Sequence, residues 1–320
     1  TIPNFLVIKH FLGNVDKLIF ITTHKMETND IKTSRSAWLA NALGINVYDI
    51  DRVILREDDY FYNIERLKGS IDENNEIILN ITGGTKIMVL SCYDFFKNKG
   101  NLKSVVYLPI NQNIIKFIYP GQYEEKLKSI LTIDDYLKSY GLCYKSEKPE
   151  IDYDILSKLF IKFKRSGYDI LKFTEGYEDE YKNKYTGHWF EEFIYHKIKD
   201  DLLLDENSIK INVKISYYTN FDDSSIDNEF DIFFIHNFKL NILECKVSLG
   251  KNKSSNLLQS INKLGAVKRN FGINCNTYII TLSEIENIDD VNRKANIAGI
   301  NQIIDRRFFL QNKSFKDIFK

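Results

Sequence analysis

The sequence predicts a two-domain α/β protein, and three observations support this. The chain has 320 residues, enough for about two domains of roughly 150 residues each. Through residues 1–120, short apolar runs rich in β-branched residues alternate with segments of helical periodicity, the pattern of a mostly parallel sheet between helices. After residue 150 the order changes to helices, three strand-like runs, a helix and a final strand. We therefore expect domains at 1–140 and 150–320, joined by the polar connection 141–149.

The elements of the first domain follow from apolar runs and their stop signals. Gly44 ends one helical pattern, and Thr132 begins another as an N-cap in front of an Asp pair. The expected strands are 18–23, 47–50, 53–55, 76–81, 105–108 and 114–118. The expected helices are 33–43, 58–67, 86–97 and 132–140.

The second domain has longer strand patterns. Phe193, Ile194 and Ile198 recur at helical spacing, which predicts a helix over 191–198. The polar stretch 219–229 separates two apolar runs and is expected to be a mobile loop. The expected strands are 209–218, 230–235, 240–247 and 277–281, with a helix at 256–264.

Composition and charge exclude several classes of protein. Lys and Arg total 44, and Asp and Glu total 44, so no overall basic field favours nucleic acid, although a local basic patch is compatible with this balance. No run approaches 18 apolar residues, so we expect no membrane span. The four cysteines have no metal-ligand spacing and there is no secretory signal, which predicts reduced thiols in a cytoplasmic protein.

The strongest chemical signal is the group Asp231, Glu244 and Lys246. Glu244 and Lys246 are two residues apart on a predicted strand, so both point to one face. A hairpin turn centred on Asn237 and Phe238 would place Asp231 directly across from Glu244, with Cβ atoms roughly 5 Å apart. Facing carboxylates destabilise a sheet unless a cation neutralises them, and hard divalent cations prefer carboxylate oxygens.

A lysine beside such a pair can orient a water or stabilise a developing negative charge. The strand pair, with Phe230 before Asp231 and then Glu244-Cys245-Lys246, resembles the PD-(D/E)XK nuclease superfamily, although the usual Pro is replaced by Phe230. The alternative is an ordinary Glu-x-Lys that solvates the face of a strand.

This resemblance implies further site residues. It implies a catalytic Glu on the preceding helix, which is Glu191 or, as the alternative, Glu192 of the run Gly187-His-Trp-Phe-Glu-Glu. It also implies a Gln or Lys on the following helix, for which Gln259 is the candidate. Asp231, Glu244 and Glu191 would bind one or two Mn²⁺ or Mg²⁺ ions, with Lys246 as the fourth catalytic residue. The basic residues after the strand are expected either to contact phosphates or to lie on a solvent-exposed helix face: Lys251, Lys253, Lys263, Lys268 and Arg269.

A glycine-rich turn lies between a strand and a helix of the first domain. In Asn80-Ile-Thr82-Gly83-Gly84-Thr85-Lys86, free N–H groups and a helix N-terminus converge, which favours an anion. The spacing is neither a Walker A loop nor a dinucleotide fingerprint, so it gives little support to NTP hydrolysis. Taken alone, the two glycines would indicate only a tight turn before a Thr N-cap.

In its place between strand and helix, this turn resembles that of CARF domains, the sensors of cyclic oligoadenylate in type III CRISPR immunity. The start of the chain, Thr1-Ile-Pro3-Asn4, resembles the segment after the first CARF strand, which implies that this strand precedes Thr1. The resemblance implies a Rossmann-like domain that binds its ligand through Thr1, Pro3, Asn4, Asn80, Thr82, Gly83, Gly84, Thr85 and Lys86.

With both resemblances in this order, the chain is similar to the stand-alone CRISPR ancillary nucleases. They imply a homodimer that binds one cyclic tetra-adenylate across its two-fold axis, uses Mn²⁺ or Mg²⁺, and cuts or nicks DNA, with single-stranded RNA as a second substrate. Two alternatives remain. One is a nucleotide-sensing regulator that binds nucleic acid without cutting it, and the other is an unregulated repair or restriction nuclease.

Overall fold

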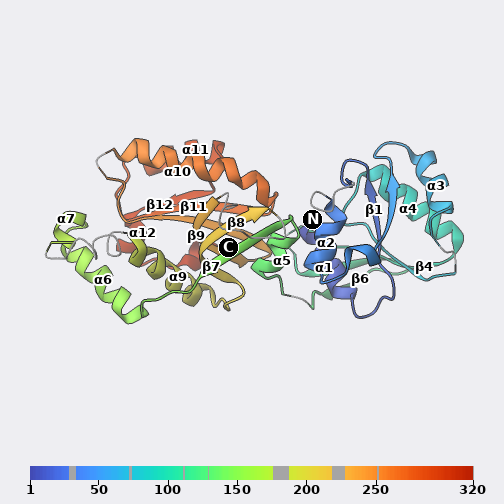
Figure 1. Cartoon of the computed structure of the whole chain (residues 1–320), viewed down its shortest axis with the longest axis horizontal. Coiled ribbons are helices and arrows are strands. Elements are labelled where there is room, and N and C mark those ends of the chain that lie inside the picture. The colour runs from blue at the N-terminus through green and yellow to red at the C-terminus, as the bar shows by residue number, and fades with distance from the viewer. Residues whose placement is uncertain are drawn as a thin grey trace. The chain divides into compact units, whose positions relative to one another are not determined.

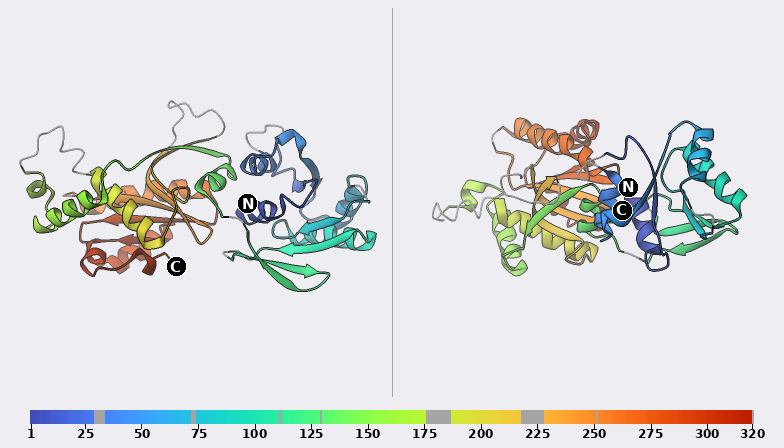
Figure 2. Two further views of the ribbon diagram at one scale, coloured as in Figure 1. Left: turned by 90° about the horizontal axis from the view of Figure 1, so that it is seen from below. Right: turned by 45° about the vertical axis from the view of Figure 1, so that its right-hand side comes forward.

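The computed structural model describes residues 1–28, 34–71, 74–110, 112–128, 130–175, 187–217, 228–250 and 252–319 (Figure 1). The chain divides into two compact units, Thr1–Leu142 and Cys143–Lys320. Each unit has its own sheets and helices, seen from two further sides in Figure 2. None of the described helices is long and apolar enough to cross a membrane.

The first unit contains two separate sheets with helices around them. Its helices are α1 (Ile2–Phe11), α2 (Arg35–Ala42), α3 (Tyr60–Lys68), α4 (Lys86–Lys99) and α5 (Ile133–Lys138). Its strands are β1 (Ile19–Thr23), β2 (Asp51–Leu55), β3 (Ile77–Asn80), β4 (Leu102–Tyr107), β5 (Ile114–Tyr119) and β6 (Tyr123–Lys126). The pairs β1–β2 and β3–β4 are parallel, as predicted, whereas β5 and β6 continue the second sheet in antiparallel fashion.

Side-chain caps begin the helices of this unit where the sequence indicates. The Thr85 hydroxyl accepts the N–H of Met88 at the start of α4, and Thr132 forms a capping box with Asp135 at the start of α5. Both caps fix the point where the chain turns from loop to helix, and the first places the glycine-rich turn directly before α4. The apolar faces of α3 and α4 pack with β2, β3 and β4 around Leu67, Phe96 and Val105.

The second unit is built on one six-stranded sheet in the order β12-β11-β10-β9-β8-β7. Its strands are β7 (Leu142–Glu147), β8 (Ile209–Tyr217), β9 (Asn228–His236), β10 (Lys239–Lys246), β11 (Cys275–Thr281) and β12 (Gln302–Ile304). Its helices are α6 (Tyr153–Arg165), α7 (Ile170–Phe173), α9 (Trp189–Leu202), α10 (Lys253–Lys268), α11 (Ile288–Ile297) and α12 (Arg306–Leu310). In Figure 1, α10 and α11 cover one face of the sheet, and α9 and α12 lie on the other.

The hairpin register predicted for β9 and β10 is correct. Asn237 and Phe238 both have positive φ, the geometry of a two-residue hairpin turn. Lys239 pairs with His236, and the ladder continues in this register to Leu243 and Ile232. Asp231 and Glu244 therefore follow at the point where the paired ladder ends.

Two expectations for local structure differ from the fold. Residues Val47–Asp49 form a 3₁₀ turn, because the Asn46 side chain caps the N–H of Tyr48 and draws the chain into a tight bend. The expected connection 141–149 contains β7, since its backbone can complete the edge of the second sheet next to β8. Most of the expected loop at 219–229 lies outside the described residues.

Candidate functional sites

The carboxylate of Glu244 on β10 lies between two ammonium groups. Its side chain is only 5% exposed. Lys246 Nζ lies 2.8 Å from Oε1, and Lys263 Nζ from α10 lies 3.0 Å from Oε2. Both carboxylate oxygens are thus engaged by positive charge, which offsets the cost of burying the carboxylate.

Asp231 lies beside this group at the end of the β9–β10 ladder. The backbone N–H of Cys245 donates to its Oδ2 at 2.5 Å, so the side chain spans the point where the strands stop pairing. Burial, followed by the negative charges of Glu244 and Glu191, raises the pKa of Asp231 to about 8. Burial alone would lower the pKa of Lys246, but the charges of Asp231 and Glu244 outweigh it and raise that pKa.

The two adjacent glutamates at the start of α9 differ in burial and in their partners. Glu192 is fully buried, and its carboxylate accepts the backbone N–H groups of Glu150 and Ile151 at 2.9 and 2.7 Å. Glu191 is 19% exposed and close enough to Asp231 to shift its pKa. His188 lies between them, 3.5 Å from Glu191 and 3.0 Å from Glu192, and its hydrogen bond to Glu191 raises its pKa. Glu192 thus anchors the chain before α6, whereas Glu191 faces the Asp231 cluster.

A cavity of about 490 Å³ opens over the Glu244–Lys246 pair. It is lined by Glu244, Lys246, Ser248, Leu249, Asn256, Gln259, Ser260 and Lys263. Gln259, the residue expected on the following helix, therefore belongs to this wall. Lys263 was expected only as a phosphate contact or a solvated residue, and its place on Glu244 was missed. The signal was available, because Gln259 and Lys263 are four residues apart and share one helix face.

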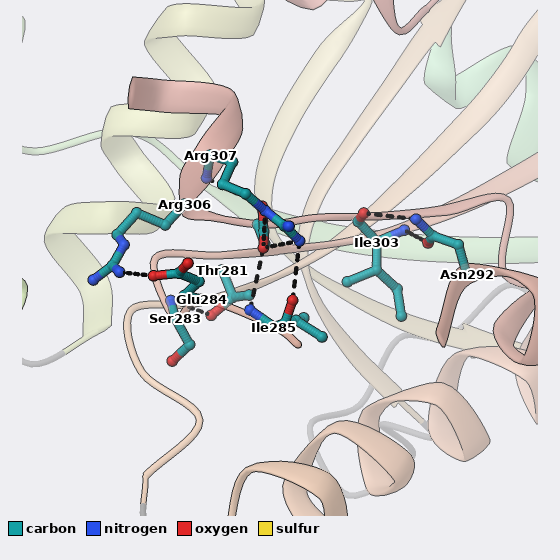
Figure 3. Close-up of polar contacts among 9 residues, drawn as sticks. Thr281, Ser283, Glu284, Ile285, Asn292, Ile303, Arg306 and Arg307 are labelled. Atoms are coloured by element: carbon teal, nitrogen blue, oxygen red, sulfur yellow. Dashed lines mark hydrogen bonds and ion pairs between the residues drawn. The ribbon is translucent and has the colours of Figure 1, made fainter. Parts of the chain in front are cut away.

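The far wall of this cavity is held by the loop that follows β11. Ser283 Oγ accepts the N–H of Leu249 at 2.8 Å, and its own N–H donates to Thr281 at 3.1 Å. Beyond it, Ile285 and Arg307 both bind the buried Asp305, and Arg306 pairs with Glu284 (Figure 3). This network fixes the position of the chain segment just after Lys246.

The donor chemistry of the cluster fits a hard divalent cation. Burial, and then repulsion from the carboxylates of Glu244 and Glu191, raises the pKa of Asp231, and a cation held by these three side chains would relieve the repulsion. The ligands are not gathered as a ready set, since the described residues contain no group of three or more acidic, His or Cys side chains at metal-binding distance. Lys246 and Lys263 hold Glu244 in the arrangement seen here.

In the first unit, the structure brings together two segments far apart in sequence. Asn80 Nδ2 donates to Oδ1 of Asn4 at 3.2 Å, joining the end of β3 to the first turn of α1. A Cβ added at Gly83 would lie 2.5 Å from Asn4 Nδ2, so only glycine fits there without moving that amide. Thr1 is the N-cap residue of α1 and Pro3 lies in its first turn, so these expected residues lie at the same helix start.

Some of the remaining residues of the turn bond to neighbouring backbone, and others are available to bind a ligand. Thr82 Oγ1 accepts the N–H of Leu108 at 2.9 Å, while Thr85 donates to the carbonyl of Glu57 and caps α4. Thr85 thus both donates to and accepts from neighbouring backbone, whereas the Thr82 hydroxyl only accepts in these contacts and keeps its own hydrogen for a ligand. Gly84 has φ +88°, a conformation that favours glycine, and Lys86 is the first residue of α4. The groups that can still bind an anion are the helix N-termini, the two asparagine amides, the Thr82 hydroxyl and Lys86.

Comparison with known families covers both units. The model of the Card1 CARF domain matches residues 1–136, and that of the Card1-like endonuclease domain matches 179–315. No curated protein sequence matches the chain.

Three solved structures share the fold over nearly the whole chain. Can2 from Sulfobacillus thermosulfidooxidans, solved with cyclic tetra-adenylate, is 20% identical with a TM-score of 0.70, covering 97% of this chain and 94% of its own. Protein VC1899 from Vibrio cholerae is 16% identical with a TM-score of 0.67, covering 96% and 93%. A type III CRISPR defence DNA nuclease activated by cyclic oligoadenylate is 14% identical with a TM-score of 0.58, covering 94% of this chain and 48% of that protein.

Proposed function

The chain belongs to the Card1-type family that joins a CARF domain to an endonuclease domain, and we propose that it is a metal-dependent nuclease activated by cyclic tetra-adenylate. The observation that carries the proposal is the convergence of Asp231, Glu244 and Lys246 at the end of one strand pair. Glu191 from α9 completes the group. The ligand class comes from the likeness to Can2, which was solved with cyclic tetra-adenylate.

In this proposal, each candidate site residue of the second unit has a defined role. Asp231, Glu244 and Glu191 would hold Mn²⁺ or Mg²⁺, which supplies Lewis acidity toward the scissile phosphate. Lys246 donates a hydrogen bond that orients the attacking water or stabilises the charge that develops on a phosphate oxygen. Glu192 fixes the start of α9 from behind and so holds Glu191 in position.

The first unit would sense the ligand. The turn Asn80–Lys86 and the start of α1 present amide groups and two helix N-termini, which suit the phosphates and bases of a cyclic oligonucleotide. In a homodimer, two such turns would bind one ring across the two-fold axis. The nuclease would cut or nick DNA, and single-stranded RNA as a second substrate, in antiviral defence. We place it in the cytoplasm, where its four free cysteines stay reduced.

A cleavage assay tests this proposal. Supercoiled plasmid and labelled single-stranded RNA are incubated with Mn²⁺, with and without cyclic tetra-adenylate, alongside the isosteric variant Glu244→Gln. Cleavage that requires the ligand and disappears in Glu244→Gln supports both halves of the proposal. Ligand-independent cleavage contradicts the sensor. Ligand binding without cleavage under any condition favours a regulator that binds nucleic acid without cutting it.

A further inference from the structure

One imidazole ring lies between the two glutamates at the start of α9. Nδ1 of His188 is 3.5 Å from Oε2 of Glu191, and Nε2 is 3.0 Å from Oε1 of Glu192. Glu191 faces the Asp231 cluster, whereas Glu192 anchors the chain before α6. We propose that His188 is a positioning residue, which holds the Glu191 carboxylate in the orientation that binds the divalent cation. This inference rests on the proposed function.

The spacing of residues at the start of α9 brings the three side chains together. His188 precedes Glu191 by three positions and Glu192 by four, and side chains at these spacings lie on one helix face. The His188 side chain makes no capping bond to the helix backbone, so it can reach both glutamates. The next residue, Trp189, is fully buried, and its ring lies 5.9 Å from that of Phe163 on α6. This packing fixes the backbone from which the ring of His188 projects.

Glu192 gives the imidazole ring a fixed point of attachment. Its buried carboxylate accepts the backbone N–H groups of Glu150 and Ile151, in the connection between β7 and α6, at 2.9 and 2.7 Å. Such a carboxylate cannot rotate without leaving polar groups unsatisfied, which is costly away from water. The position of the His188 ring is therefore set by the carboxylate that Nε2 contacts.

Glu191 has no comparable support of its own. Its side chain is 19% exposed, and among the described residues no side chain other than His188 bonds to it. A long, partly exposed side chain otherwise samples several rotamers. Hydrogen-bond partners of this kind orient metal ligands, and the loss of one typically reduces metal affinity or activity by about 10–100-fold. The contact with His188 is thus the one that can orient Glu191 before the cation binds.

Two other roles for His188 make different predictions. A direct role on the cation or the substrate would require a free ring nitrogen, but each nitrogen already faces a glutamate oxygen. A purely structural role would depend on the bond to Glu192 alone. Variants that keep only one of the two contacts separate this structural role from the positioning of Glu191.

Calorimetry with Mn²⁺ on the full chain, without nucleic acid, tests the inference. His188→Ala removes both contacts and is expected to bind Mn²⁺ about tenfold more weakly than the wild type. His188→Asn keeps an amide near the position of Nδ1 and can still donate to Glu191, whereas the amide of His188→Gln lies near Nε2 and donates to Glu192. We expect His188→Asn to recover most of the affinity and His188→Gln to recover little.

A matched control removes an exposed histidine of the first unit. His24→Ala should bind Mn²⁺ as the wild type does. Thermal unfolding checks that each variant is folded, and if His188→Ala unfolds, the comparison of the two amides decides. Equal recovery by both amides, greater recovery by His188→Gln, or unchanged affinity in His188→Ala overturns the positioning role alone. A wild type that does not bind Mn²⁺ overturns the proposed metal site and the positioning role together.

Discussion

The two candidate sites lie at the ends of strands in separate units, but they consist of different chemical groups. The turn after β3 consists of glycines, backbone amides and asparagines, and its threonine hydroxyls both bond to neighbouring backbone. The cluster at the end of β9 and β10 consists of carboxylates and lysines that neutralise one another. The first site therefore depends on shape and the second on charge balance. Substitutions that add volume should damage one, and those that remove charge should damage the other.

The largest expected effect comes from removing the ammonium group of Lys246. Lys246→Met keeps the length of the side chain but loses the hydrogen bond to Glu244 and the charge beside it. We expect the rate of cleavage to fall by about 10²–10³-fold, the usual loss when one donor to the transition state is removed. Single-turnover cleavage measures this, and Lys253→Met, in the first turn of α10, is the matched control. A variant that cuts at the wild-type rate would remove Lys246 from the mechanism.

The neighbouring glutamates of α9 should respond in opposite ways. Glu192→Ala removes the buried carboxylate that accepts two partly buried backbone N–H groups, so we expect a loss of about 3 kcal/mol in the free energy of unfolding. Glu191→Ala should leave stability nearly unchanged and reduce cleavage. Urea unfolding and cleavage rates, measured on both variants, separate the two roles. Equal stability losses would mean that Glu191 is also structural.

In the first unit, a methyl group added at Gly83 should weaken ligand binding. Gly83→Ala places its Cβ against the Asn4 amide and displaces it from Asn80. We expect cyclic tetra-adenylate to bind about tenfold more weakly, the effect of losing about 1.4 kcal/mol. Calorimetry measures this affinity. Gly121→Ala, where an added Cβ meets no atom within 4 Å, should bind as the wild type does.

The pH dependence of stability should reveal the crowding of carboxylates around Asp231. Burial and the charges of Glu244 and Glu191 raise its pKa from 3.8 to about 8, so the folded protein holds this proton more tightly than the unfolded chain. Stability from this group is therefore lost as the pH rises between these values. Without metal, Asp231→Asn should gain in melting temperature relative to the wild type up to about pH 8. A difference that does not change with pH would contradict the raised pKa.

The smallest expected effect concerns Lys263. Its ion pair with Glu244 must be given up when that carboxylate binds a cation, and a partly exposed pair of this kind contributes at most about 1 kcal/mol. Lys263→Met should therefore bind Mn²⁺ about two- to fivefold more tightly by calorimetry. Weaker binding would show instead that Lys263 holds Glu244 in place for the metal.

Local signals in the sequence predicted the core elements of both units. Apolar runs and caps located most of the strands and helices, because a strand or helix must bury its own apolar face wherever it packs. A turn centred on Asn237 and Phe238 predicts the hairpin register, and this register is enough to place Asp231 next to Glu244. Strand β7 was missed because an edge strand is polar on its exposed side and resembles a loop.

The sequence by itself determined the two-domain α/β architecture, the Asp231–Glu244–Lys246 group and the glycine turn, because each depends on spacing within one or two adjacent elements. Only the tertiary structure decided which side chains from distant elements meet these groups. It separated Glu191 from Glu192 by burial, brought Lys263 onto Glu244, and bonded the Thr82 and Thr85 hydroxyls to neighbouring backbone. Such choices depend on how helices pack on a sheet, and residue spacing along the chain carries no record of that packing.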